Sequence, residues 1–260
     1  TLAISGKTIA IGSYVGDGGG PDLGSVFVFV SVNGVWNHEA TLTPVDPQVS
    51  SYFGMAVRIS GDTIIVGASK YGEDDHGAAY VFTRSSGIWT QEAKLTGDIS
   101  QETFGCSVSV FGDTAVVGAC QEYEGSSRVG AAYIFSRTDG IWSKGKRLLA
   151  SDGTAGDAFG STVAIVSDTL IVGAADDDDL AIGSGSAYIF VKDAGVWTEQ
   201  VKLTAPDYRK YDSFCNTLSY DGEHLLVGAS TQNAPEHASG AAYIFALNPR
   251  AGASNWQLYD

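Results

Sequence analysis

The sequence predicts an all-β fold, a β-propeller of five four-stranded antiparallel blades. The prediction rests on a cassette of about fifty residues that recurs along the chain, a period typical of propellers and solenoids. The first marker of the cassette is a glycine-small pair that closes an apolar run, at Gly12-Ser13, Gly67-Ala68, Gly118-Ala119, Gly173-Ala174 and Gly228-Ala229. The second marker is an aromatic-x-Phe triplet, at Phe27-Val28-Phe29, Tyr80-Val81-Phe82, Tyr133-Ile134-Phe135, Tyr188-Ile189-Phe190 and Tyr243-Ile244-Phe245. Copies that stay in register in this way predict one blade each.

The third cassette shows the four strands of a blade in order. Residues 104–110 alternate small or polar side chains with apolar ones, which is the period of a β-strand. Gly112-Asp113 supplies a tight turn, and the β-branched run 114–119 is typical of a strand covered on both faces. A polar loop leads to a third strand at 130–135, and a second turn leads to a more polar fourth strand ending near Leu149. Four antiparallel strands joined in sequence form the unit of a propeller.

The whole chain, residues 1–260, is predicted to be a single propeller domain, because no Pro- or Ser-rich linker interrupts the repeats. The cassettes span approximately 1–51, 52–102, 103–157, 158–212 and 213–260. The last residue aligns with a position just before the start of a cassette, and the first residue aligns with a position just after one has begun. We expect the five repeats to close into a ring by joining the end strands. Five units taken from a longer seven-bladed or tandem array would show the same ends.

The charge and hydropathy of the chain exclude two classes of partner. The sequence has 30 Asp and Glu against 15 Lys and Arg, a formal net charge of −15. Such acidity argues against a nucleic-acid partner, which requires a basic face. No apolar run approaches the roughly eighteen residues of a membrane span, so none is predicted. The acidity suits a secreted or surface protein, one that handles divalent cations, or simply a need for solubility.

Two motifs of the cassette give the chain a family resemblance. Phe53-Gly54, Phe104-Gly105 and Phe159-Gly160, each followed by a Val-Gly-Ala triplet, resemble the FG-GAP repeat. Among members of that family the chain is most similar to the microbial and algal form. In that form each repeat ends with Gly-(Ile/Val)-Trp and a Lys-Leu-Thr strand, as at Gly87-Ile88-Trp89 and Lys94-Leu95-Thr96. The departures are Phe214-Cys215, Gly12-Ser13 and the missing Phe-Gly at the start.

The resemblance implies a fold and a broad function. FG-GAP repeats form the β-propeller at the head of integrin α chains, so the family implies a propeller, commonly of seven blades. It also implies an extracellular or cell-surface protein involved in adhesion or ligand binding. Integrin-like members hold calcium in an Asp-rich loop between the Phe-Gly and Gly-Ala strands. Here that connection is a short turn such as Phe111-Gly112-Asp113-Thr114, too short for six or more oxygen ligands, so those calcium sites are not expected.

A different loop, the one that follows each Gly-Ala pair, is acidic in successive cassettes. Because this loop recurs at one end of every blade, its carboxylates are expected to share one face of the propeller. The candidate partner-binding residues are Asp17, Asp22, Glu73, Asp74, Asp75, Glu122 and Glu124. The candidate metal ligands are Asp176, Asp177, Asp178 and Asp179, whose mutual repulsion a calcium ion would relieve. The alternative is a solvated acidic rim without a bound ion, and the fold itself requires no cofactor.

One tryptophan per cassette follows a glycine turn. Packing between neighbouring blades suits this regular position, because aromatic side chains bring a large apolar area to a contact. The alternative is a set of stacking platforms for sugars, as in a propeller lectin. The five residues are Trp36, Trp89, Trp142, Trp197 and Trp256.

The three cysteines are Cys106, Cys120 and Cys215. Cys106 and Cys120 flank one predicted hairpin. A disulfide forms there if the turn places the two residues opposite each other, whereas a shift of one residue turns them to opposite faces. Cys215 stands where the other cassettes have the glycine of Phe-Gly, and it is expected to be a small buried residue.

No arrangement of residues predicts an enzyme. The four histidines, His38, His76, His224 and His237, lie in predicted loops and turns without ligand spacing, and no Gly-x-Ser-x-Gly or His-Glu-x-x-His motif occurs. Asp157 and Asp212 recur with Glu102 at one repeat position, which suggests a structural role such as closing a turn. We therefore expect no catalytic residues.

Together these features predict a non-enzymatic extracellular recognition or adhesion module. It would present the acidic loop face of a rigid propeller to a protein or glycan partner at the cell surface. The first alternative is a structural subunit of an extracellular filament or appendage, in which copies of the chain bind one another. The second alternative is a propeller lectin or a carbohydrate-active enzyme.

Overall fold

The computed structural model of the chain describes residues 1–15, 23–70, 76–98, 103–230, 233–234, 237–238, 240–247 and 256–259. Every regular element in these ranges is a β-strand. Six residues singled out above lie outside the described ranges: Asp17, Asp22, Glu73, Asp74, Asp75 and Glu102.

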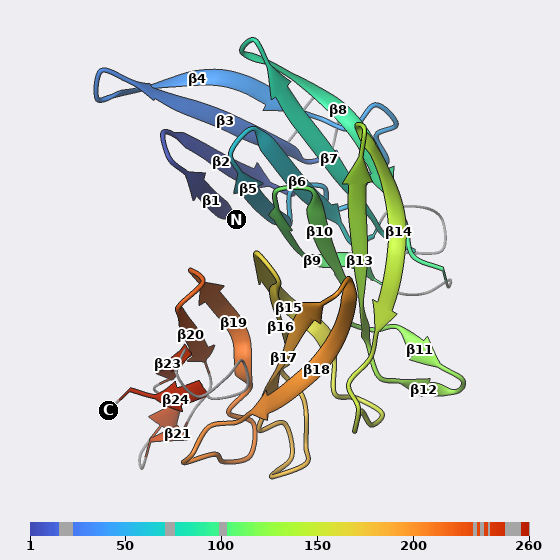
Figure 1. Cartoon of the computed structure of the whole chain (residues 1–260), viewed down its shortest axis with the longest axis vertical. Helices are drawn as coiled ribbons and strands as arrows, with labels where there is room; N and C mark the ends of the chain where they lie inside the picture. Colours follow the sequence, from blue (N-terminus) through green and yellow to red (C-terminus); the bar gives the residue numbers. More distant parts are fainter. Residues whose placement is uncertain are drawn as a thin grey trace.

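Five four-stranded antiparallel sheets form the blades, as predicted (Figure 1). Blade 1 contains β1 (Leu2–Ser5), β2 (Thr8–Ser13), β3 (Ser25–Val32) and β4 (Val35–Leu42). Blade 2 contains β5 (Ala56–Ser60), β6 (Thr63–Ala68), β7 (Ala78–Ser85) and β8 (Ile88–Leu95). Blade 3 contains β9 (Phe104–Phe111), β10 (Thr114–Ala119), β13 (Ala131–Thr138) and β14 (Ile141–Leu148). Blade 4 contains β15 (Phe159–Val166), β16 (Thr169–Ala174), β17 (Ser186–Asp193) and β18 (Val196–Leu203). Blade 5 contains β19 (Phe214–Tyr220), β20 (His224–Ala229), β23 (Ala241–Leu247) and β24 (Trp256–Leu258).

Two small ribbons extend the loops that follow Gly-Ala. In blade 3, β11 (Tyr123–Glu124) pairs with β12 (Ser127–Arg128), and in blade 5, β21 (Asn233–Ala234) pairs with β22 (His237–Ala238). The sequence predicted only polar loops at these places, because pairs this short carry no periodic signal.

In every blade the first strand is innermost, and the first strands of all five blades line one central cavity. Hydrogen bonds run from the first strand to the second, third and fourth in chain order. The second-to-third loops and the links between blades therefore lie at one end of the propeller. The turns that close the first and third hairpins lie at the other end.

The glycines of the two repeat motifs meet each other across the seam between blades. A Cβ atom added to Gly67 of blade 2 would lie 2.1 Å from the carbonyl oxygen of Gly105 in blade 3. Gly105 itself has φ +91° and sits in a bulge of β9, where a Cβ atom would lie 2.4 Å from the Ala78 oxygen. Glycine at both positions permits this close approach of two backbones without a side-chain clash or backbone strain. Phe-Gly and Gly-Ala thus act as the two halves of one interblade contact.

Apolar side chains fill the same seam. Ile65 and Val81 of blade 2 join a buried cluster with Phe104 of blade 3. The Phe104 ring meets Tyr133 edge-on at 5.5 Å and Phe135 at 6.1 Å between ring centroids. The same triad of rings recurs in blades 2, 4 and 5. The phenylalanine that begins this motif therefore anchors each of blades 2 to 5 on the blade before it.

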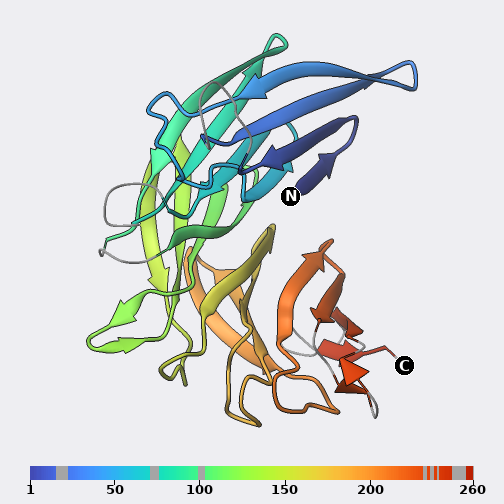
Figure 2. The same ribbon diagram turned by 180° about the vertical axis from the view of Figure 1, so that it is seen from behind.

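The end strands do not join, contrary to the expectation of a ring closed by pairing. Within the described residues β1 pairs only with β2, and β24 pairs only with β23. Figures 1 and 2 show the first blade, in blue, and the fifth, in orange to red, at the two ends of an arc. Each terminal blade already has four strands of its own, so neither needs a strand from the other.

Candidate recognition surface

The face that carries the second-to-third loops and the interblade links holds the predicted acidic residues. In blade 4, Lys202 lies beneath this face on the fourth strand. It occupies the repeat position that Lys94 has in blade 2 and Arg147 has in blade 3. The Lys202 Nζ lies 2.8 Å from Asp177 Oδ2, 2.6 Å from Asp179 and 2.9 Å from Asp152. Asp152 comes from the link between blades 3 and 4, so the cluster ties the loop of blade 4 to the seam.

Tyr188 completes this cluster from the third strand. Its hydroxyl lies 2.9 Å from Asp177 Oδ2 and 2.7 Å from Asp152 Oδ1. One hydroxyl proton serves one acceptor at a time, so the two carboxylates compete for it. Asp177 is almost completely buried beneath the loop, whereas Asp176 and Asp178 are exposed. The loop is therefore held from below by Asp177, and its neighbours face the solvent.

Electrostatics fix the charge states in this cluster. Burial disfavours the charged form of Lys202, but its hydrogen bonds to Asp177, Asp179 and Asp152 outweigh burial and raise its pKa. Burial tends to raise the pKa of Asp152, but the hydrogen bonds from Lys202 and Tyr188, together with the charge of Lys202, outweigh burial and lower it. Burial, together with the hydrogen bond to Asp152, raises the pKa of Tyr188. At neutral pH the cluster thus combines the ammonium group of Lys202, the ionised carboxylate of Asp152 and the neutral phenol of Tyr188.

Lys202 supplies the positive charge that Asp177 and Asp179 require. In the described part of the chain, no group of three or more His, Cys, Asp or Glu side chains is arranged to hold a metal ion. Calcium at Asp176–Asp179 therefore stays a prediction, and a cation there would have to compete with Lys202 for two of the four carboxylates.

Glu122 and Glu124 of blade 3 differ in their exposure. The Glu122 side chain is completely buried and binds Arg147 Nε, and burial raises its pKa above the ordinary value. Glu124, in β11, is largely exposed and lies 2.8 Å from Arg147 Nη2. Glu122 thus supports the loop, and Glu124 remains accessible to a partner.

Exposed apolar side chains lie on the acidic loop of blade 4 and on the neighbouring link to blade 5. Leu180 and Ile182 are exposed on this loop, and Tyr208 and Tyr211 are exposed on the link to blade 5. Tyr211 is the most accessible of the four, with 61% of its surface exposed. The amide of Tyr211 donates to the Ile182 carbonyl at 2.7 Å, so the loop and the link form one continuous surface.

We name this the blade-4 surface, and its exposed residues are Asp176, Asp178, Asp179, Leu180, Ile182, Tyr208 and Tyr211. The repeat pattern indicated the acidic half of this surface but not the apolar half. The two tyrosines lie in an interblade link that has no strand period. The signal that could have identified them is the presence of two tyrosines, Tyr208 and Tyr211, in one short and otherwise polar link.

The tryptophans lie at the seams in four of the five blades. Trp89 Nε1 donates to Glu39 of blade 1 at 2.8 Å, and Trp142 Nε1 donates to Glu92 of blade 2 at the same distance. Trp197 and Trp256 belong to the buried clusters of the next two seams. Trp36 is 45% exposed, because no described residues pack on that side of blade 1.

Cys106 and Cys120 are free thiols that lie side by side. The Cys120 amide donates to Cys106 Sγ at 3.2 Å, and the bulge in β9 displaces Cys106 from the regular ladder. Burial raises the pKa of Cys106, whereas the hydrogen bond from Cys106 lowers the pKa of Cys120. A disulfide between them stays a prediction. Cys215 is completely buried, as expected.

The remaining candidate acids and bases have local structural partners. Asp157 accepts hydrogen bonds from the amide and the hydroxyl of Thr154, and Asp212 accepts one from the amide of Arg209. Both carboxylates therefore close the turn before the first strand of the next blade. His38 Nε2 lies 3.0 Å from Thr41 Oγ1, and His224 lies 3.3 Å from Asp221. Neither contact pairs a histidine with a nucleophile set in a pocket.

Comparison with known proteins identifies the repeat. The FG-GAP repeat family matches residues 36–82, 89–135, 142–190 and 197–245. Each match runs from the tryptophan of one blade to the aromatic-x-Phe triplet of the next, so it is centred on a seam. Comparison with curated proteins finds no match. The described residues include no helix long and apolar enough to cross a membrane.

FG-GAP propellers are typically non-catalytic interaction modules of extracellular or cell-surface proteins. The particular likeness to integrin heads and to microbial or algal members stays a prediction. The four matches cover most of the chain and coincide with the four seams of the structure, and the chain therefore belongs to the FG-GAP repeat family.

Proposed function

We propose that this chain is a non-enzymatic recognition or adhesion module of the cell exterior, which binds a protein or glycan through the blade-4 surface. The observation that carries the proposal is that exposed tyrosines, Tyr208 and Tyr211, lie on a link that is hydrogen-bonded to the loop on which Asp176 and Asp178 are exposed. Family membership supports the general class of protein interaction, and the acidity of the chain suits an extracellular setting.

The composition of the surface suits recognition. Exposed tyrosines and aliphatic side chains provide the apolar area from which interface energy comes, and tyrosine adds a hydroxyl for hydrogen bonding. The exposed carboxylates add charge complementarity, which contributes mainly to specificity and to the rate of association. The Lys202 cluster beneath the loop holds these residues in place before a partner arrives, which lowers the entropic cost of binding.

Binding of the labelled chain to a glycan panel and to immobilised cell-surface proteins tests the proposal. Replacing Tyr208 and Tyr211 with serine should abolish any binding that the native chain shows, and Asp176→Asn with Asp178→Asn should weaken it. Ile141→Ser is the matched control, because Ile141 is exposed at a hairpin turn on the opposite end of the propeller. Loss of binding in the Ile141 variant, but not in the tyrosine variant, would contradict the proposal.

The same glycan panel addresses the lectin alternative. If tryptophan platforms bind sugars, Trp36→Ala should remove glycan binding without changing the melting temperature, since Trp36 is the most exposed of the five. A carbohydrate-active enzyme would release reducing sugar from a bound glycan. We expect neither result.

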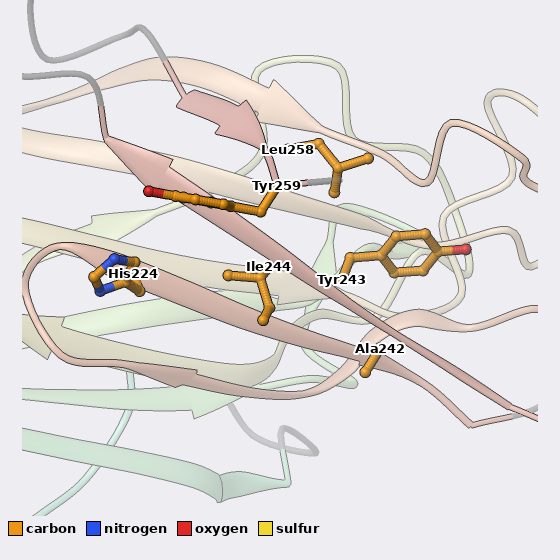
Figure 3. Close-up of a pocket in the computed structure, with 6 residues that line it drawn as sticks. All are labelled: His224, Ala242, Tyr243, Ile244, Leu258 and Tyr259. Atoms are coloured by element: carbon orange, nitrogen blue, oxygen red, sulfur yellow. The ribbon is translucent and has the colours of Figure 1, made fainter.

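A second candidate function, a subunit of an extracellular filament, is favoured by the two open faces of the arc. The face of blade 5 that is turned away from blade 4 exposes Leu226, Ile244 and Leu258. A cavity of about 530 Å³ on this face is lined by residues that include Ile244 and Leu258 (Figure 3). The face of blade 1 that is turned away from blade 2 exposes Ile11 and Phe27. At the interior seams these same two kinds of face pack on each other, so one copy of the chain could bind the next head to tail.

Light scattering after size exclusion, over a range of concentrations, tests this assembly. The native chain should grow beyond a monomer as concentration rises, and Leu226→Glu with Ile244→Glu should hold it at the monomer mass. Val196→Glu, at an exposed turn away from both open faces, is the control. A monomer at every concentration would remove the filament proposal and leave the recognition proposal intact.

A further inference from the structure

The central cavity of the propeller has a volume of about 460 Å³ and is lined by segments of β1, β5, β9, β15 and β19. The residues that line it are mainly short or apolar, and the exposed apolar side chains among them are Leu2, Ile4 and Phe111. Arg58, on β5, is the one charged side chain among the residues that line it. The residue lies at the axis of the fold, far from the loops that the repeat pattern indicated as functional.

Arg58 breaks the repeat at a position where the other blades have small residues. Strand register identifies the equivalents, because Arg58 pairs with Ile65 of the second strand as Ser109 pairs with Val116. The residues at this position in the five blades, taken in order, are Ala3, Arg58, Ser109, Ala164 and Ser219. The repeated blade structure accounts for the small residues at this position in four blades. It does not account for the arginine in blade 2.

The guanidinium of Arg58 has no acidic partner among the described residues. Its Nη1 donates one hydrogen bond, to the Val57 carbonyl oxygen at 2.9 Å. By contrast, Arg84 and Arg137 each pair with two carboxylates on the outer part of the blades. Burial lowers the pKa of Arg58, which reflects the cost of removing its charge from water. Arg58 is therefore a largely buried cation without a neutralising carboxylate among the described residues, in a chain whose net charge is −15.

Serine hydroxyls add further donors to the cavity. Ser109 Oγ accepts a hydrogen bond from the Ile165 amide at 3.1 Å, and Ser5 Oγ accepts one from the Gly61 amide at 3.1 Å. Each hydroxyl therefore keeps its own proton available for donation. Ser60 and Ser219 also line the cavity. The site combines one fixed positive charge, several hydroxyl donors and apolar walls.

We infer that this central cavity binds a small monocarboxylate with an apolar tail, held by Arg58. The planar fork of a guanidinium matches a carboxylate, with two parallel N–H···O bonds. One arginine balances one negative charge, whereas a phosphate dianion would need a second cation, and the residues lining the cavity include none. The volume exceeds that of a carboxylate group, and the exposed side chains of Leu2, Ile4 and Phe111 provide apolar surface for the remainder of the ligand.

Isothermal titration of the whole chain with hexanoate, hexanol and inorganic phosphate tests the inference. Hexanoate should bind saturably at one site, and roughly tenfold more tightly than hexanol, because a charge-assisted hydrogen-bond pair is lost with the alcohol. Phosphate should bind more weakly than hexanoate. Equal binding of hexanoate and hexanol would show an apolar cavity only, and stronger binding of phosphate would show a different anion site; either result would overturn the inference.

Variants at position 58 separate charge from geometry. Arg58→Ser introduces the residue that blades 3 and 5 have at this position, so the fold should persist, as circular dichroism can verify. It should weaken hexanoate binding about tenfold, and Arg58→Lys should weaken it less, because the charge remains but the fork is lost. Arg128→Gln, at an exposed position on β12, is the control and should bind as the native chain does. Unchanged affinity in Arg58→Ser would disprove the inference.

Discussion

An interior blade and the terminal blades contain the same residue types at the same positions but bury them differently. On the second strand, Ile171 of blade 4 is completely buried, whereas Leu226 of blade 5 is 44% exposed. On the third strand, Tyr133 of blade 3 is completely buried, whereas Phe27 of blade 1 is 36% exposed. Each seam is made by two neighbours, so a blade at either end of the arc lacks half of its contacts. Stability in such an array depends on nearest neighbours rather than on the cassette alone.

The largest expected difference between the two kinds of face comes from removing an apolar side chain. Ile171→Ala should lower the free energy of unfolding by about 4 kcal/mol, because it leaves a cavity in a closed seam. Leu226→Ala should cost about 1 kcal/mol, because much of that side chain already contacts water. Urea denaturation at several protein concentrations measures both. A cost for Leu226→Ala that rises with concentration would show that a second copy covers blade 5.

The glycines of the Gly-Ala pairs give a second comparison. Gly118→Ala should cost about 3 kcal/mol, because its Cβ atom would lie 2.0 Å from the Gly160 backbone oxygen of the next blade. At Gly228, in blade 5, the atoms nearest an added Cβ atom belong to Thr217 and Asn216 of the same blade, the nearest being a Thr217 side-chain methyl group 2.5 Å away. Gly228→Ala should therefore cost less than about 1 kcal/mol. Equal melting temperatures for the two variants would contradict the seam contact as the reason for the motif.

The Lys202 cluster offers a comparison through pH. Lys202 lowers the pKa of Asp152, so this pair stabilises the fold above the ordinary pKa of a carboxyl group, and the contribution is lost as pH falls through the lowered value. Lys202→Met should cost about 2 kcal/mol at neutral pH, since it leaves Asp177 buried without its cation. The loss should shrink as the solution is made more acidic. A loss that stays constant from neutral to acidic pH would show that Lys202 acts by packing alone.

The sequence predicted the interior seams more completely than the functional surfaces. Phe104-Gly105 and Gly118-Ala119 repeat because backbone geometry demands them, so the blades could be identified from periodicity. Tyr208, Tyr211 and Arg58 do not repeat, and nothing in the spacing showed that the first two share a surface or that the third reaches the axis. Ring closure was also beyond the pattern, because closure depends on how blades 1 and 5 meet in space. Residues that do not follow the repeat can therefore be placed in space only from the three-dimensional structure.

The smallest expected effect concerns blade 5, in which Phe214-Cys215 replaces the Phe-Gly motif. Cys215 occupies the bulge position of blade 5 with φ +68°, where Gly105 and Gly160 have φ +91° and +89°. A side chain in this left-handed region costs about 1 kcal/mol, which glycine avoids. The buried thiol contributes less apolar area than a large side chain, and burial raises its pKa to about 12, so it stays protonated near neutral pH. Cys215→Gly should therefore raise the free energy of unfolding by up to about 1 kcal/mol in urea denaturation, with Cys215→Ala as the control that keeps the strain. A Cys215→Gly variant that is less stable than Cys215→Ala would contradict this prediction. It would show that side-chain packing at the seam between blades 4 and 5 contributes more to stability than the relief of backbone strain does.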